Sequence, residues 1–88
     1  MAWSARFELR AVAELRKLDR TAQERIIRYL QERVATGDSS RARGKALVGG
    51  AVKLWRYRIG DYRAICMIDD ENQLVLVLRV AHRKEAYR

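Results

Sequence analysis

In the first part of the chain, apolar residues are spaced three and four apart, which predicts two amphipathic helices. Residues 9–18 hold the first pattern, with Glu14 among the charged residues on its wet side. A second helix is predicted after Asp19, where Thr21 and Glu24 match a capping box. The two helices are expected to run antiparallel. Their expected packing positions are Ala11, Val12, Leu15 and Leu18, followed by Ile26, Ile27, Leu30 and Val34.

The second part of the chain alternates apolar and polar residues with the two-residue period of half-buried strands. An antiparallel meander of three strands is predicted over residues 54–59, 62–68 and 74–80, and a short N-terminal strand at 3–7 is expected to join it. The last apolar run is expected at the centre of the sheet. The predicted fold is a single α+β domain over residues 1–88, with both helices on one face and the other face open and basic.

The segment 54–63 places several arginines on one face of a predicted hairpin. Gly60–Asp61 is expected to form a two-residue turn, which pairs Arg58 with Arg63 and leaves Arg56 further along the same side. Like charges opposite one another in a sheet cost a few tenths of a kcal/mol up to about 1. A chain that gathers these arginines is therefore expected to meet an anion there, and phosphate is the anion that we favour.

The length of the second turn decides whether Arg79 and Arg83 join this face. The turn is expected within Asp69–Gln73. A five-residue turn places both arginines on the side of Arg63, whereas a four-residue turn places them on the opposite side. Arg58 and Arg79 are each interpreted either as a solvated sheet residue that discourages edge pairing or as an RNA contact.

Composition favours a polyanion as the partner. The 88 residues include 19 Lys and Arg against 11 Asp and Glu, which gives a net charge of +8 and a pI of about 10.4. Such a charge attracts nucleic acid and also membrane surfaces. However, no apolar run approaches the roughly 20 residues that span a bilayer. The first residues do not resemble a signal peptide, so we expect a cytoplasmic protein without a membrane partner.

Cysteine and histidine are too few for an internal disulfide or a clustered metal site. Cys66 is the single cysteine and His82 the single histidine, so neither a metal nor a cofactor is expected. Cys66 falls on the Trp55 and Tyr57 side of the hairpin and is interpreted as a buried apolar residue. Trp55, Tyr57 and Trp3 are expected to pack in the core rather than to stack on bases.

A segment rich in small and basic residues, 36–52, connects the helices to the strands. It is predicted to be a loop and is interpreted either as a solvated connection or as a nucleic-acid contact. Lys45 within it and Lys53 after it are candidate RNA-binding residues, because they lie beside the predicted hairpin.

Three blocks of this sequence, in this order and spacing, resemble the RelE/ParE superfamily of toxins from type II toxin–antitoxin systems. They are Leu54–Arg63, Ile68–Asp70 and Val80–Arg88, and they are most similar to the RelE-type mRNA endoribonucleases. The resemblance covers nearly the whole chain. It implies a metal-independent enzyme that depends on the ribosome and cuts mRNA in the A site, and a cognate RelB-like antitoxin that wraps and neutralises it.

The resemblance also implies a catalytic set, which consists of Arg56, Arg63, Arg83 and Tyr87. Attack by a 2′-hydroxyl on the neighbouring phosphate passes through a phosphorane with added negative charge, which guanidinium groups stabilise. Tyr87 is a candidate for one of the two proton transfers. The predicted RNA-binding residues are Lys45, Lys53, Arg58 and His82.

Leu54 departs from the family pattern, because some members have a lysine two residues before the position of Arg56. The general base is therefore unassigned. His82 is interpreted either as a packing residue or as a group that transfers a proton or contacts phosphate. Glu85 is interpreted as an ion-pair partner of Arg83 or as a base.

Two other functions remain open at this point. One is a ParE-like, non-enzymatic inhibitor of DNA gyrase, which would have no chemical need for phosphate-facing cations combined with Tyr87. The other is a RelE-fold module without catalytic activity, whose basic face binds an acidic antitoxin or RNA. The departure at Leu54 keeps this second alternative open.

Overall fold

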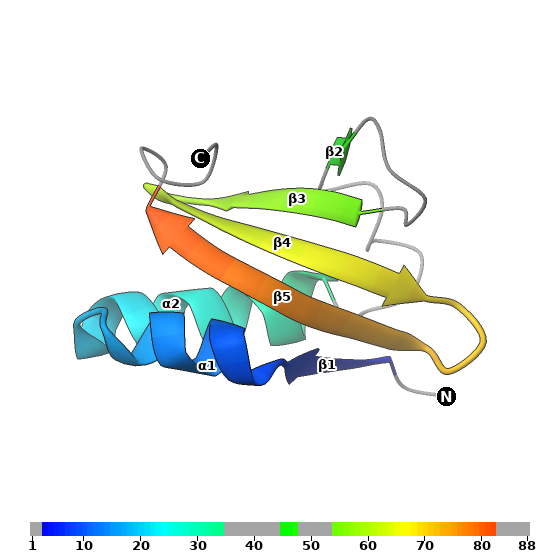
Figure 1. The fold of residues 1–88 in the computed structure, drawn as a ribbon, viewed down its shortest axis with the longest axis horizontal. Coiled ribbons are helices and arrows are strands. Elements are labelled where there is room, and N and C mark those ends of the chain that lie inside the picture. The colour runs from blue at the N-terminus through cyan, green and yellow to red at the C-terminus, as the bar shows by residue number, and fades with distance from the viewer. Residues whose placement is uncertain (1–2, 35–44, 48–53, 83–88) are drawn as a thin grey trace.

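The computed structural model describes residues 3–34, 45–47 and 54–82. These residues form a five-stranded sheet in the order β1-β5-β4-β3-β2, with helices against one face (Figure 1). The predicted α+β architecture is confirmed. The strands are β1 (Ser4–Phe7), β2 (Lys45–Leu47), β3 (Leu54–Ile59), β4 (Tyr62–Asp69) and β5 (Leu74–His82). The helices are α1 (Leu9–Arg16) and α2 (Arg20–Tyr29), and α2 continues into a π-helical turn, η1 (Leu30–Val34).

Asp19 fixes the start of α2. Its Oδ1 accepts a hydrogen bond from the Ala22 N–H at 2.8 Å, because the first N–H groups of a helix have no partner within the helix. The predicted capping box is wrong, since Thr21 already lies inside the helix. Residues 17–19 alone connect α1 to α2, so the two helices lie side by side (Figure 1). Within the described ranges, no helix is long and apolar enough to cross a membrane.

The meander of β3, β4 and β5 is antiparallel as predicted, and β1 joins it as a parallel partner of β5. The parallel register runs from Ser4 opposite Leu74 to Phe7 opposite Val77. The middle strand of the sheet is β4, because β1 and β2 each add an edge. The prediction that the last strand is central is therefore wrong by one position.

Residues 45–47 form a strand where the sequence predicted a loop. Lys45 pairs with Arg56 and Leu47 with Leu54, so β2 extends the sheet beyond β3. A three-residue strand is too short to show a period in the sequence. It forms because the free backbone groups along the edge of β3 need hydrogen-bond partners. The rest of the predicted loop lies outside the described residues.

The helices and the sheet enclose a hydrophobic core on the predicted side of the hairpin. Tyr57 and Cys66 are fully buried, and Trp55 and Trp3 pack against the core. Burial raises the pKa of the Cys66 thiol to about 12, because a thiolate there would lose its water. The thiol is therefore protonated and unreactive at neutral pH. The buried hydrophobic residues are Ala11, Leu15, Ala22, Ile26, Leu30, Tyr57, Ile59, Ala64, Cys66, Val75, Val77 and Val80.

A β-bulge in β5 resolves the question of the second turn. Asp69 pairs with Leu74, which leaves the four residues 70–73 in the turn. A turn of that length would by itself direct Arg79 away from the side of Arg63. However, the register shifts so that Leu78 has no partner in β4, and the extra residue restores the original parity. Arg79 consequently pairs with Ile65 and shares the side of Arg63 by register.

Candidate functional site

Three arginines of the β3–β4 hairpin share the sheet face opposite the helices. Arg58 lies directly opposite Arg63, and Arg56 lies opposite Ile65 in the next row of the same side. This confirms the predicted two-residue turn and its register. Directly opposed residues have Cβ atoms about 5 Å apart, and residues two apart along a strand are about 7 Å apart. We call Arg56, Arg58 and Arg63 the arginine face.

One row of this sheet face is mainly apolar. Leu54, Met67 and Leu76 form one row across β3, β4 and β5 on the same side as the arginines. The face that was predicted to be basic therefore carries its arginines by register, but it also holds this apolar row. Positive charge is concentrated toward the Gly60 turn, where the arginines follow one another along the hairpin. A bound polyanion would meet its strongest attraction there.

Arg58 and Arg63 of the arginine face differ in exposure and in hydrogen bonding. Arg58 is exposed and has no hydrogen bond or ion pair with any residue that the structure describes. The Arg63 guanidinium is half-buried, and its Nη1 donates to the Tyr62 carbonyl oxygen at 3.0 Å. Guanidinium groups held this close together repel one another until an anion neutralises their charge. The arrangement is suited to phosphate, which accepts two parallel hydrogen bonds from one guanidinium.

The structure places the remaining predicted site residues differently. The backbone of Lys45 in β2 pairs with that of Arg56, so the missed strand brings this lysine to the row of an arginine. Lys53, Arg83 and Tyr87 lie outside the described residues, and their roles stay predictions.

His82 lies on the helix side of the sheet. It pairs with Tyr62, which in turn pairs with the buried Ile59, and this row faces away from the arginine face. The rings of Tyr62 and His82 pack edge to face, with centroids 5.6 Å apart and planes at 83°. The packing interpretation of His82 therefore has a structural basis. Its predicted contact with RNA stays a prediction.

A family model described as ParE toxin of type II toxin–antitoxin system, parDE, matches residues 5–87. The chain belongs to the RelE/ParE superfamily of type II toxins. It is 34% identical over 91 residues to Toxin RelG of Mycobacterium tuberculosis, and the aligned region covers 100% of this chain and 99% of that relative.

Solved structures of RelE toxins have the fold of this toxin. The toxin–antitoxin complex RelBE2 of M. tuberculosis contains a chain with a TM-score of 0.76 and 32% identity, covering 97% of this toxin and 95% of that chain. A double mutant of the Escherichia coli toxin RelE in the free state gives a TM-score of 0.75 and 26% identity, covering 99% of this toxin and 90% of that chain. The isolated E. coli RelE toxin gives a TM-score of 0.71 and 28% identity, covering 98% and 92% of the two chains.

A carboxylate from α1 holds the end of β5 in this toxin. The pairing of β1 with β5 ends at Val77, so the next part of β5 has a free edge. Glu14 Oε1 accepts a hydrogen bond from the Val80 N–H at 2.9 Å. Its Oε2 accepts from Arg79 Nη2 at 2.9 Å and from Nε at 3.1 Å.

These contacts correct two expectations from the sequence. Glu14 was expected on the wet side of its helix, but it is half-buried against β5. Arg79 is bound to this carboxylate rather than solvated or free for RNA. Partial burial of the Glu14 carboxyl raises its pKa. The hydrogen bonds from Arg79 and Val80, with the charges of Arg79 and Arg10, outweigh this and hold the pKa below its ordinary value.

Replacing Glu14 by glutamine is expected to lower the free energy of unfolding by about 1–3 kcal/mol at pH 7, because two partners lose a charged acceptor. The ionised form makes these bonds, so the contribution is complete above the ordinary pKa of 4.5. It is lost as the pH falls through the lower pKa of the folded protein. Urea unfolding midpoints of the toxin and of Glu14→Gln should therefore converge as the pH is lowered from 7 to 3.

Glu24→Gln is the matched control for this measurement. Glu24 makes an exposed pair with Arg20 at 3.3 Å, one helical turn away, and such pairs contribute about 0–1 kcal/mol. Equal losses of stability in the two variants at every pH would contradict the structural role of Glu14.

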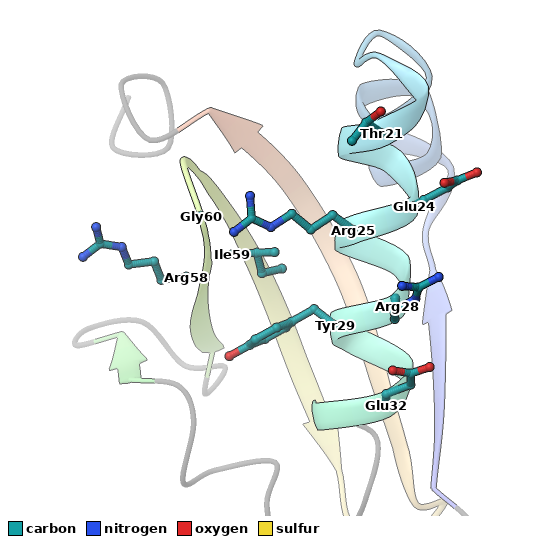
Figure 2. Close-up of a pocket in the computed structure, with 9 residues that line it drawn as sticks. All are labelled: Thr21, Glu24, Arg25, Arg28, Tyr29, Glu32, Arg58, Ile59 and Gly60. Carbon is teal, nitrogen blue, oxygen red and sulfur yellow. The ribbon is translucent and has the colours of Figure 1, made fainter.

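Sequence reasoning missed a cation that reaches the hairpin from the helices. Arg25 extends from α2 toward the Gly60 turn and Tyr29 extends toward β3, across a cleft between the two elements (Figure 2). Gly60 has a φ of +60°, which favours glycine, and a Cβ there would lie 2.9 Å from Arg25 Cζ. Arg25 sits on the outer side of a helix in the sequence pattern, so no periodic signal marked it. Only the packing of α2 beside β3 brings it to the turn.

Proposed function

We propose that this toxin is a metal-independent endoribonuclease that cleaves mRNA on the ribosome. The observation that carries the proposal is the arginine face, where Arg58 and Arg63 are directly opposed with Arg56 in the next row. A fold has no structural need to oppose two cations, since the pairing costs a few tenths of a kcal/mol up to about 1. A phosphate bound between them reverses that cost. The likeness to Toxin RelG and to RelE structures supports the same reading.

The proposed chemistry is attack of a 2′-hydroxyl oxygen on the adjacent phosphorus. The P–O5′ bond breaks, the attacking oxygen loses its proton and the leaving 5′-oxygen gains one, which yields a 2′,3′-cyclic phosphate and a 5′-hydroxyl. Arg56 and Arg63 stabilise the charge that develops on the phosphorane, which is greater than the charge of the substrate. By their match to the family motif, Arg83 adds a third guanidinium and Tyr87 transfers a proton.

An antitoxin is the proposed protein partner. The M. tuberculosis RelBE2 and E. coli RelBE structures are toxin–antitoxin complexes, and the net charge of +8 on this toxin favours an acidic protein. We propose that such an antitoxin binds and neutralises the toxin in the cytoplasm, where translating ribosomes supply the substrate.

Inhibition of DNA gyrase is the second candidate, because the matching family model is that of a ParE toxin. It requires a protein interface rather than a phosphate site. The arginine face gives it no specific support.

The deciding experiment incubates purified toxin with mRNA on programmed ribosomes, beside the Arg83→Ala variant. Transition metals are removed with a chelating resin, and Mg²⁺ is kept because the ribosome needs it. The proposal expects cleavage in the A site, with 2′,3′-cyclic phosphate and 5′-hydroxyl ends, that is lost in the variant. Intact mRNA with inhibited gyrase supercoiling would support the second candidate. If neither activity is found, the fold serves here only for binding.

A further inference from the structure

The cleft between α2 and the end of β3 has a volume of about 480 Å³. Arg25 and Tyr29 reach into it from the helix, and Ile59 and Gly60 form its other wall (Figure 2). Pockets that bind small ligands have volumes of roughly 300–1,000 Å³ and combine an apolar surface with a few polar groups. The cleft is therefore large enough for one nucleotide.

The cations of this cleft lack anionic partners within the described part of the chain. Arg25 and Arg28 are exposed, and neither makes a hydrogen bond or ion pair with a described residue. Glu24 is held by Arg20 at 3.3 Å, and both Glu24 and Arg28 point away from β3, whereas Arg25 extends toward the Gly60 turn (Figure 2). This leaves Glu32 as the acidic lining residue that no described residue neutralises. The attraction of this cleft for an anion therefore comes from Arg25, the cation that extends across it (Figure 2).

The Arg25 guanidinium is placed by packing rather than by a carboxylate. It lies against the bare backbone of Gly60, where a Cβ would come within 2.9 Å of its Cζ and Nη1 atoms. Its N–H groups make no hydrogen bond to any residue of the described ranges. A guanidinium that is positioned before binding loses little side-chain freedom when it binds phosphate through two hydrogen bonds.

Tyr29 provides an aromatic surface in the same cleft. Its ring is half-buried and packs against the hydrophobic core, so it has little freedom to move. Single-stranded RNA is bound by cations for its phosphates and by aromatic rings on which its unpaired bases stack. Arg25 and Tyr29 supply one group of each kind, four residues apart on one helix.

Arg58 connects the cleft to the arginine face. It borders the cleft, while its side chain projects from β3 on the side away from α2 (Figure 2). An RNA strand that lay on the arginine face and continued past the Gly60 turn would meet Arg25. An acidic protein segment would match the charge of the cleft, but it would need neither a flat ring nor continuity with Arg58.

We infer that the α2–β3 cleft binds one nucleotide of single-stranded RNA, beside the nucleotides on the arginine face. Arg25 binds its phosphate and Tyr29 stacks on its base. This inference rests on the proposed function and adds a subsite to it. The subsite contributes binding energy for the RNA strand without touching the reacting atoms.

The test measures binding of a fluorescent 12-nucleotide single-stranded RNA by anisotropy over a range of salt concentrations. All its riboses are 2′-O-methylated, so it cannot be cleaved and binding is read independently of catalysis. Tyr29→Leu is expected to weaken binding about 5- to 100-fold through the loss of stacking. Arg25→Ala should reduce the slope of log affinity against log salt by about 0.7. Tyr29→Phe keeps the ring and should bind within about twofold of the unmodified toxin.

Arg16→Ala is the matched control for charge, because it removes an exposed arginine from the end of α1. Unchanged binding by Tyr29→Leu and Arg25→Ala would overturn the subsite, as would a failure of the unmodified toxin to bind this RNA. If Tyr29→Leu and Arg25→Ala bind the RNA normally but no longer bind an acidic peptide, the cleft is a protein-binding site instead. If the cleft variants lose RNA binding but the toxin does not cleave mRNA, the subsite stands and the proposed function fails.

Discussion

Replacing Arg63 by alanine is expected to slow mRNA cleavage by about 10²–10³-fold, the usual cost of removing one donor that stabilises a developing oxyanion. Arg63 lies opposite Arg58 in a hairpin paired at six positions, so its place on the arginine face is fixed by the backbone. The loss should fall on the rate constant of cleavage rather than on substrate binding, because charge increases in the transition state. Single-turnover cleavage on saturating programmed ribosomes measures that constant directly.

Two variants make this result specific to the position of Arg63. Arg63→Lys keeps the charge but loses the planar fork of donors, so its rate is expected to lie between those of the toxin and Arg63→Ala. Arg16→Ala removes an exposed charge from α1 and should cleave at the unmodified rate. The catalytic role of Arg63 is refuted if Arg63→Ala and Arg16→Ala cleave equally fast.

Replacing Ile26 by alanine is expected to lower the free energy of unfolding by about 2–5 kcal/mol. Ile26 is 0% exposed at the centre of the helix face that packs on the sheet. Its truncation removes buried methyl groups and leaves a cavity that close-packed neighbours fill poorly. A domain of 88 residues has a total stability of roughly 4–13 kcal/mol, so this single change removes a large share. Urea denaturation should show a lower midpoint with an unchanged slope.

Ile27→Ala is the control on the same helix, with the same change of side chain. Ile27 is only partly buried at the margin of the core, so less apolar surface becomes exposed and a smaller cavity forms. Its loss of stability is expected to be clearly smaller than that of Ile26→Ala. Equal losses would mean that α2 does not pack on the sheet through Ile26.

The hairpin was predictable because its signals are local. A period of two, a glycine at the turn and the pairing rule of antiparallel strands fix which residues lie opposite each other, and Arg58 opposite Arg63 followed directly. The inward side was equally clear, since Tyr57 and Cys66 are fully buried. Neighbouring residues carry all of this information.

The placement of Arg79 was not predictable by the same rules. The length of the second turn predicts one side, and the bulge at Leu78 restores the other. The position of the bulge depends on how β5 packs against β4 and α1, and no residue near Leu78 in the sequence indicates it. Glu14 illustrates the same limit, because a charged residue beside an apolar stripe is usually solvated, whereas here a free strand edge needs an acceptor.

The sequence by itself determined the fold class, the family and the shared side of Arg56, Arg58 and Arg63, because periodicity and turn chemistry act over a few residues. Only the tertiary structure decided what lies beside that face. It paired Lys45 with Arg56 through β2, bound Arg79 to Glu14 and brought Arg25 against Gly60. The last two contacts join residues far apart in the chain, and their approach depends on how helices and strands pack around a common core. The first depends on a strand too short to show a period in the sequence.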